Sequence, residues 1–412
     1  MSDALTGPVE FDPFSQTYFD NPYDVYRRLR DESPVYHNPH YGFWALSRYH
    51  DVAPAIKDFE TYSSASGITL EMVLNPDNRL AEAPMIIMMD PPEHTRMRKL
   101  VNKAFTPRAV AGLEQMITDT IYSYLHQLDP VHFDAVADFS DLFPFDVITT
   151  MLGVPDEDRA KVRDWLAKPL ERKPGEMASS DDAVAGIRAA GAYYYGLIQQ
   201  RRAEPRDDMI TRLTAVEVDR DDGTTTRLSD LEITGFVSLL GGAGAETVAK
   251  LIGNAIVLFA EHPEQWRLLR AQPDLVPAAV EEILRHQPPA QYDVRTTTRE
   301  VTLHGCTIPA GSPVLLLLAA ATRDERQFDD ADTFDITRRH SGHNLAFGYG
   351  AHSCLGAALA RMEARIALRA LLDFLPEYKV DHQGMKRVMA TSVAGWSNVP
   401  VTRTTTAVSA PA

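Results

Sequence analysis

The residues best suited to chemistry lie in one short run, where positions 347–356 read FGYGAHSCLG. Cys354 stands between glycines, directly ahead of a helix-like stretch that begins AALARMEARI. The dipole and free N–H groups at a helix N-terminus favour a thiolate, and the glycines let a large flat group approach the backbone beside Phe347. A lone cysteine is more often an inert buried side chain. This spacing instead favours a thiolate that binds iron.

A second group able to do chemistry lies within the clearest long helix. An S-x-x-E capping box at 229–232 and apolar residues as far as 263 predict roughly 34 helical residues, or about 50 Å. Positions 241–247 read GGAGAET, and each glycine costs about 1 kcal/mol relative to alanine inside a helix. Close helix packing would account for the glycines. Glu246 and Thr247 follow at once, however, and an acid beside a hydroxyl can deliver protons to a pocket opened by the weakened helix.

Cationic groups occur at helical spacing further upstream. Asp90-Pro-Pro-Glu93 predicts a helix start, with Asp90 as N-cap and Pro91 in the first turn. His94 and Arg98 are then i, i+4 neighbours on one face, where two cationic donors suit a pair of carboxylates.

The cysteine run resembles the haem-ligand loop of the cytochrome P-450 family. Motifs matching that family extend from the region of Tyr23 to Trp396. The resemblance implies a mainly α fold with small β-sheets, the cytochrome P-450 fold, with the long helix over haem b and the cysteine loop beneath it. The loop match is carried by Phe347, Gly348, Gly350, His352, Cys354, Gly356, Ala360 and Arg361.

The resemblance also implies roles for particular residues. Cys354 would be the axial ligand of the haem iron, and Glu246 and Thr247 would manage protons, although the family more often has Asp at the acid position. The other cofactor-binding positions would be His94, Arg98, Arg295, His352, Phe347 and Gly348, the first four of them at the haem propionates. A structural core of Glu282, Arg285 and Arg338 would lock the haem-binding region. His343-Asn344-Leu345 departs from the family spacing, in which His directly precedes Leu, so the local path of the loop is open.

The implied activity is that of a haem-thiolate monooxygenase, which inserts one atom of dioxygen into a small, mainly apolar organic substrate by hydroxylation or epoxidation. The same fold could instead run peroxide-driven, desaturating or oxidative-coupling chemistry. A non-enzymatic haem sensor and a cysteine-nucleophile transferase, with His352 as its base, are remoter alternatives. The family's pocket walls would include Met89, Leu240, Ala243, Tyr292, Asp293, Val393 and Trp396.

Composition sets further bounds. The chain has 412 residues and a net charge of −16, which disfavours nucleic acid as a partner. Two cysteines and no apparent signal or membrane anchor predict a cytoplasmic protein without disulfides. The sequence contains neither a nucleotide-binding fingerprint nor enough cysteines for an iron–sulfur cluster, so a separate ferredoxin and ferredoxin reductase are expected to supply electrons. The basic stripe Arg361, Arg365 and Arg369 is either a docking patch for that ferredoxin or a solvated face.

The remaining pattern predicts one domain over 1–412, with a short flexible N-terminus and a frayed tail at about 403–412. Residues 33–58 read as a strand pair followed by a helix, and 296–318 read as a second group of strands. The acidic segment around 219–222 reads as a solvated connection.

Overall fold

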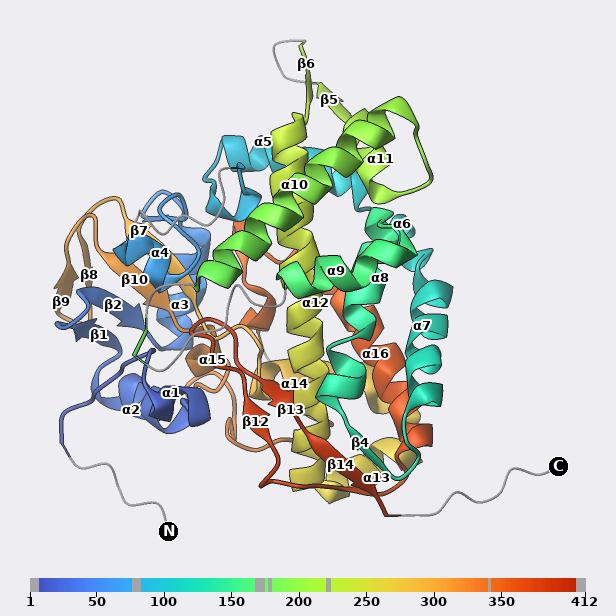
Figure 1. Ribbon diagram of the computed structural model, residues 1–412. Coiled ribbons are helices and arrows are strands. Elements are labelled where there is room, and N and C mark those ends of the chain that lie inside the picture. The colour runs from blue at the N-terminus through green and yellow to red at the C-terminus, as the bar shows by residue number, and fades with distance from the viewer. Residues whose placement is uncertain are drawn as a thin grey trace.

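One long helix, α12 (Asp230–Glu261), runs through the middle of the structure, and other helices pack around it (Figure 1). The computed structural model describes residues 7–75, 83–166, 175–176, 180–219, 224–339 and 342–404. The predicted capping box is confirmed, because the Ser229 side chain accepts from the Glu232 N–H and the Glu232 side chain accepts from the Ser229 N–H. By length and composition α12 could cross a membrane, but 72% of its most apolar window is buried inside the protein, so it is a core helix.

The helices form most of the molecule. Those before α12 are α1 (Gln16–Asp20), α2 (Tyr23–Glu32), α3 (Tyr49–Lys57), α4 (Leu70–Leu74), α5 (Glu93–Ala104), α6 (Pro107–Ala111), α7 (Glu114–Gln127), α8 (Phe143–Leu152), α9 (Asp156–Leu166), α10 (Asp181–Ala203) and α11 (Met209–Ala215). Those after it are α13 (Pro263–Ala271), α14 (Val276–His286), α15 (Leu318–Ala321) and α16 (Ala357–Phe374). A π-helical turn, η3 (Val136–Ser140), precedes α8, and short 3₁₀ turns lie at η2 (Ile86–Met88), η4 (Pro273–Leu275), η5 (Leu345–Phe347) and η6 (Gly350–His352).

The strands make small sheets beside the helices. The largest has five strands in the order β1-β2-β10-β7-β3, and β10 pairs with β2 in parallel while its other pairs are antiparallel. Its strands are β1 (Val35–Asn38), β2 (Phe43–Leu46), β3 (Tyr62–Ser63), β7 (Asp293–Thr297) and β10 (Pro313–Leu316). The smaller sheets contain β4 (His132–Asp134), β5 (Glu217–Asp219), β6 (Thr225–Arg227), β8 (Val301–Leu303), β9 (Cys306–Ile308), β11 (Tyr378–Val380), β12 (Lys386–Arg387), β13 (Trp396–Asn398) and β14 (Pro400–Arg403).

The side chains of β10 point alternately into two separate hydrophobic clusters, one on each face of the large sheet. Val314 and Leu316 belong to a cluster with α3, whereas Leu315 faces the opposite way into a cluster with α1 and α2. Successive side chains of a strand point to opposite faces, so one short apolar strand serves both cores. A third and larger cluster surrounds α12.

The secondary structure tests several of the sequence predictions. The mainly α class, the strand pair and helix within 33–58, and the strand group at 296–318 are confirmed. The prediction of a solvated connection around 219–222 was incomplete, because β5 and β6 pair antiparallel on either side of it. Residues 220–223 lie outside the described part. Of the predicted tail, Arg403 belongs to β14, and residues 405–412 lie outside the described part. The single-domain expectation stays a prediction.

The predicted start of α5 was wrong. The helix begins at Glu93 with Pro92 at the N-cap position, rather than with Asp90 there and Pro91 in the first turn. Pro91 precedes another proline, which disfavours helical backbone at that residue. The Asp90 carboxylate instead accepts hydrogen bonds from the Ser63 hydroxyl and the Ser64 N–H.

Candidate active site

A cavity of about 310 Å³ lies between α12 and the loop that carries Cys354. Its lining is predominantly apolar and comes from segments far apart in the sequence. These include Ile86, Ile87, Ile148, Phe236, Leu239, Leu240, Ala243, Gly244, Thr247, Val248, Leu251, Pro289, Ala290, Leu318, Phe347, Leu359 and Glu363. An apolar cavity with a few polar groups is typical of a site for a small organic molecule.

The cysteine loop is held by its own backbone. The Cys354 N–H donates to the Phe347 carbonyl at 2.9 Å, and α16 begins three residues later at Ala357. Gly348 and Gly350 have φ angles of 65° and 74°, a left-handed region that favours glycine. The loop therefore places the Cys354 thiol next to the N-terminus of α16, as its sequence predicted.

The Cys354 thiol faces the cavity while protein surrounds the rest of it. Burial raises its pKa, and hydrogen bonding from the Gly356 backbone and the positive charges of Arg98 and Arg361 oppose that rise. Burial therefore opposes the thiolate that the sequence predicts, whereas these neighbours favour it. A bound metal ion would favour the thiolate strongly, because a coordinating thiol is deprotonated outright.

His94 and His352 lie against each other beside the thiol, with ring centroids 4.2 Å apart. Burial and the neighbouring Arg98 lower the pKa of His94, and burial together with His94 lowers that of His352 to about 3. Arg98 is therefore the stronger cation of the two predicted donors, and the lowered pKa of His94 opposes its positive charge. His94 is 2% exposed, and among the described residues neither of its ring nitrogens has a hydrogen-bond partner, although its imidazole can donate a hydrogen bond.

The two arginines of the predicted set make backbone contacts. Arg98 donates from Nη2 to the Ser353 carbonyl at 2.8 Å, next to the cysteine. Arg295 donates to its neighbour's carbonyl, that of Val294, at 2.7 Å and to the Asp293 carboxylate at 3.1 Å. Arg98 and Asp293 line the cavity, and Arg295 is buried behind Asp293 in β7.

On α12, Thr247 lines the cavity and Glu246 is a half-buried neighbour. The Thr247 hydroxyl donates to the Ala243 carbonyl, one turn back, at 2.9 Å. The helix is continuous through the glycines, and Gly241 and Gly244 allow close packing of neighbouring helices. A Cβ on Gly241 would lie 2.7 Å from the Tyr194 hydroxyl of α10, and one on Gly244 would lie 3.1 Å from Ile148 of α8.

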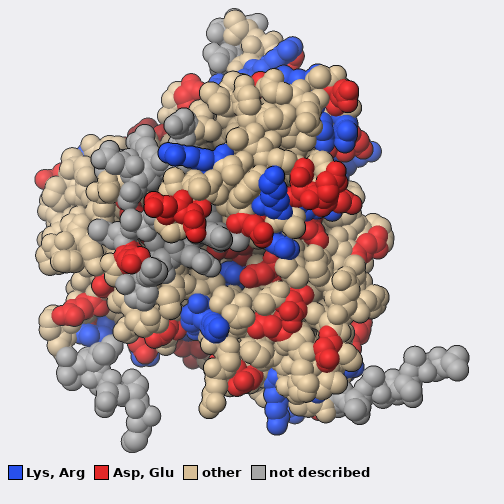
Figure 2. Space-filling view, viewed as in Figure 1, with Lys and Arg blue, Asp and Glu red and all other residues tan. Residues whose placement is uncertain are grey.

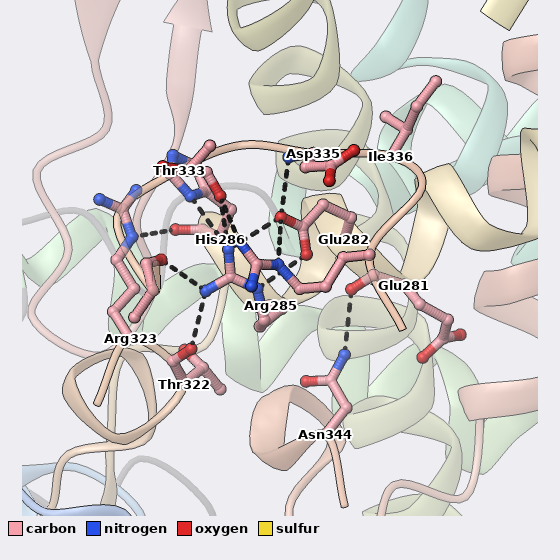
Figure 3. Close-up of polar contacts among 12 residues, drawn as sticks. Glu281, Glu282, Arg285, His286, Thr322, Arg323, Thr333, Asp335, Ile336 and Asn344 are labelled. Carbon is pink, nitrogen blue, oxygen red and sulfur yellow. Dashed lines mark hydrogen bonds and ion pairs between the residues drawn. The ribbon is translucent and has the colours of Figure 1, made fainter. Parts of the chain in front are cut away.

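The predicted ionic core is assembled at the C-terminal end of α14 (Figure 3). The Glu282 carboxylate accepts from Arg285 Nε and Nη2 at 2.7 and 2.8 Å, from Arg338 Nε at 3.1 Å and from the Asp335 N–H at 3.0 Å. Glu282 and Arg285 are completely buried. Arg285 and Arg338 also bind backbone carbonyls between Thr322 and Thr333, so the network ties α14 to the chain ahead of the cysteine loop.

The irregular His343-Asn344 step has a structural reason. The Asn344 side chain accepts from the Ala346 N–H and donates to the Glu281 carbonyl of α14. His343 stacks on Tyr349 with ring centroids 4.2 Å apart. Asn344 therefore fastens the cysteine loop to the helix that carries the ionic core.

Not all of the predicted pocket residues line this cavity. Leu240, Ala243 and Asp293 do. Tyr292, Val393, Trp396 and Met89 do not: Tyr292 packs with α1 and α2, Val393 sits in a small separate cluster, Trp396 lies under the Arg387 guanidinium, and Met89 packs against the main core. Tyr292 precedes Asp293 in an extended segment, and adjacent side chains there point to opposite faces.

The pocket residues missed by the sequence reasoning follow a simple pattern. Phe236, Leu239 and Gly244 share a face of α12 with Leu240 and Ala243, so helical spacing alone would have found them. Pro289, Ala290 and Leu318 come from loops and element ends, and no local signal marks them.

A family model described as "Cytochrome P450" matches residues 183–394. The chain belongs to the cytochrome P-450 family. Cytochrome P-450 130 of Mycobacterium tuberculosis is 40% identical over 383 residues, covering 90% of this chain and 92% of that protein. The vitamin D(3) 25-hydroxylase of Pseudonocardia autotrophica is 38% identical over 411 residues, covering 98% of each chain.

Solved structures agree with the cytochrome P-450 assignment. The cytochrome P-450 CYP109Q5 of Chondromyces apiculatus superposes with a TM-score of 0.86 at 35% identity, covering 97% of this chain and 99% of that chain. The fold is therefore the cytochrome P-450 fold, the enzyme class is monooxygenase, and the cofactor is haem b.

The residues around the cavity fit this cofactor. A free thiol is the soft ligand that the iron requires. The Arg98 guanidinium and the buried His94 imidazole, which has no hydrogen-bond partner in the described part of the chain, are donors suited to a carboxylate. Phe347 and Gly348 line the same cavity and bring an aromatic ring and bare backbone to it.

Proposed function

We propose that this protein inserts one oxygen atom from dioxygen into a small, mainly apolar organic molecule, by hydroxylation or epoxidation. The observation that carries the proposal is the shared cavity: the Cys354 thiol and the Thr247 hydroxyl both line one predominantly apolar space. Haem b, when bound, supplies the iron at which dioxygen is reduced and its O–O bond is broken. The protein's own residues then have to bind, orient and deliver protons.

In this proposal Cys354 holds the iron, and its loop fixes the sulfur. The Gly356 backbone N–H hydrogen-bonds to the sulfur and tunes its electron donation. The Arg361 guanidinium lies over the Phe347 ring, 4.4 Å from its centroid, and steadies that side of the loop. His94, Arg98, Arg295 and His352 bind the haem propionates, with the two arginines as charged donors and the two histidines as further hydrogen-bond donors.

Thr247 and Glu246 form the proton path. The Thr247 hydroxyl donates to the Ala243 carbonyl, and its oxygen keeps lone pairs that can accept a hydrogen bond. To deliver a proton, the hydroxyl has to turn from that carbonyl into the cavity. Glu246 is half-buried, which lets its carboxylate exchange protons with solvent. Its side chain is one methylene longer than the aspartate more common in the family, so it can reach one bond further along α12.

The substrate is held by the apolar wall of α12 and by the segment around Ala290. Asp293 is an acid in that wall, and its carboxylate is engaged by Arg295. An uncharged or weakly polar compound therefore suits the cavity. The names of two relatives support this class: one is a vitamin D(3) 25-hydroxylase, and another was solved with an acyl carrier protein bearing hexadec-9Z-enoic acid.

We further propose that electrons come from a ferredoxin and its reductase in the cytoplasm. Both cysteines are free thiols, which suits a reducing compartment. The basic stripe on α16 is reduced to Arg365 and Arg369, both exposed, because Arg361 is paired with Glu281. Charge reversal at these two positions should lower the ferredoxin-supported rate most strongly at low salt, whereas Arg188→Glu on α10 should not. Equal effects would remove the docking patch.

Isotope labelling tests the reaction itself. Compounds are first screened for a shift in the haem absorption spectrum, and the best binder is then turned over with ferredoxin, reductase and ¹⁸O₂. The proposal predicts a product that carries one ¹⁸O atom. A product without ¹⁸O would contradict insertion from dioxygen, and turnover with hydrogen peroxide but none with ferredoxin would replace the proposal with the peroxide-driven alternative.

A further inference from the structure

Lys250 is a buried lysine on α12 that does not line the cavity. Its side chain lies within the protein, with the residue 5% exposed, although it is only three positions beyond Thr247. The ammonium pairs with the Asp141 carboxylate at 2.9 Å, directly after the π-helical turn η3. A buried ammonium needs such a partner. The pair therefore holds the lysine stem in one place at the side of α12, next to the face that lines the cavity.

The stem of Lys250 lies directly against Gly395. A Cβ placed on Gly395 would lie 2.6, 3.0 and 3.1 Å from Cβ, Cγ and Cδ of Lys250. The shortest of these is roughly 1 Å less than the distance at which carbon atoms normally pack. Glycine is required at 395 because the lysine stem occupies the space of a side chain.

Gly395 ends a turn, residues 388–395, that joins β12 to β13. The Ala394 N–H donates to the Pro289 carbonyl at 2.8 Å, and the Gln291 N–H donates to the Ser392 carbonyl at 2.9 Å. Pro289 and Ala290 line the cavity that contains Cys354. The 388–395 turn is thus hydrogen-bonded to the segment that forms this part of the cavity wall.

The other end of the 388–395 turn is also fixed. The Thr391 hydroxyl donates to the buried Glu71 carboxylate at 2.9 Å, and the Tyr18 hydroxyl donates to the Thr391 carbonyl at 2.6 Å. The turn is therefore clamped between α1 and α4 at one end and Lys250 at the other. The hydrogen bonds to Pro289 and Gln291 link a displacement at Gly395 to the cavity wall at Pro289 and Ala290.

We infer that the Lys250–Gly395 contact sets the depth of the cavity wall at Pro289 and Ala290 and thereby selects which organic ligands fit. Lys250 and Gly395 are positioning residues in this scheme, because neither touches the ligand. The inference rests on the proposed function of the cavity as the substrate site. It adds a contact that controls ligand specificity through two residues outside the cavity lining.

The test uses two probes that bind haem iron through an imidazole nitrogen. Imidazole reports on the iron and its immediate surroundings, and 4-phenylimidazole adds a ring that reaches the cavity wall. Dissociation constants are measured by optical titration of haem-loaded Lys250→Ala, Lys250→Met, Gly395→Ala and the double variant Lys250→Ala/Gly395→Ala.

Gly395→Ala should weaken 4-phenylimidazole by about tenfold, the effect of a single methylene in an apolar pocket, and leave imidazole within about twofold. Lys250→Met keeps the stem and should resemble the parent. The double variant should bind 4-phenylimidazole better than Gly395→Ala does, because removing the stem makes room for the new methyl group. If Gly395→Ala does not load haem, the double variant and Lys250→Ala carry the comparison.

A matched control separates positioning from loss of stability. Asp208→Asn breaks another buried ion pair, with Arg201, that lies away from the 388–395 turn. It should lower the melting temperature and leave the ratio of the two dissociation constants unchanged. An unchanged ratio in Gly395→Ala and Lys250→Ala, or an equal change in Asp208→Asn, would overturn the inference. Absence of any imidazole spectrum in the parent would instead contradict the haem-based function.

Discussion

The buried network around Glu282 makes the sharpest energetic prediction. Its carboxylate accepts four hydrogen bonds, two from Arg285, one from Arg338 and one from the Asp335 N–H. In Glu282→Gln, an oxygen that replaces Oε1 keeps three of these bonds. The amide nitrogen then stands in the place of Oε2, 2.7 Å from the Nε donor of Arg285. Two donors face each other, and a buried guanidinium loses its counter-charge.

We expect Glu282→Gln to reduce the free energy of unfolding by about 3–5 kcal/mol, the cost of removing one partner from a buried ion pair. The neighbouring residue provides a matched control. Glu281 pairs with Arg361, and their side chains are 26% and 34% exposed, so Glu281→Gln should cost only about 0–1 kcal/mol. The same substitution one residue apart thus separates burial from the loss of a charge.

The assay is urea unfolding of the haem-loaded protein at pH 7, followed by far-ultraviolet circular dichroism, with the difference in midpoint multiplied by the slope. A loss below about 1 kcal/mol for Glu282→Gln, or an equal loss for Glu281→Gln, would refute the view that burial makes this network strong.

Three further predictions follow from single residues. Burial raises the pKa of Glu363, whose oxygens have no hydrogen-bond partner within the described ranges, well above its usual value. The unfolded state therefore ionises first, and stability should fall by about 1.4 kcal/mol per pH unit above the unfolded pKa. Glu363→Gln should remove that slope in melts between pH 5 and 8, and an unaltered slope would contradict the burial argument. Thr247→Ala should divert electrons from product to released hydrogen peroxide, and unchanged peroxide per electron donor consumed would end its proton role. Asn344→Ala should destabilise the protein by about 1 kcal/mol through loss of its cap to the Ala346 N–H, and no change in urea midpoint would show the cap to be dispensable.

Local signals in the sequence predicted several parts of the structure well. The capping box at Ser229 predicted the start of α12, and the spacing of Glu282 and Arg285 predicted an ion pair on one face. The glycine-rich run predicted the loop around Cys354. Each of these features is encoded within a few residues, so no distant contact is needed to recognise it.

The parts that could not be predicted depend on distant partners. The lowered pKa of His94 follows from burial and from Arg98 beside it, and the i, i+4 spacing does not reveal the burial. Arg361 pairs with Glu281, eighty positions earlier in the chain, so only Arg365 and Arg369 remain of the predicted basic stripe. Tyr292 faces away from the cavity because of how its segment enters β7. Local pattern identified the chemical groups, and tertiary contacts decided their charge and direction.

The central claim is that the Cys354 sulfur bonds directly to the haem iron. Reduction of the purified protein under carbon monoxide tests it, because the position of the resulting absorption band depends on the ligand opposite the carbon monoxide. We predict the thiolate-type band in the parent and its loss in Cys354→Ser, with Cys306→Ser indistinguishable from the parent. A thiolate-type band that persists in Cys354→Ser, or a parent that gives the band typical of a histidine ligand, would contradict the account.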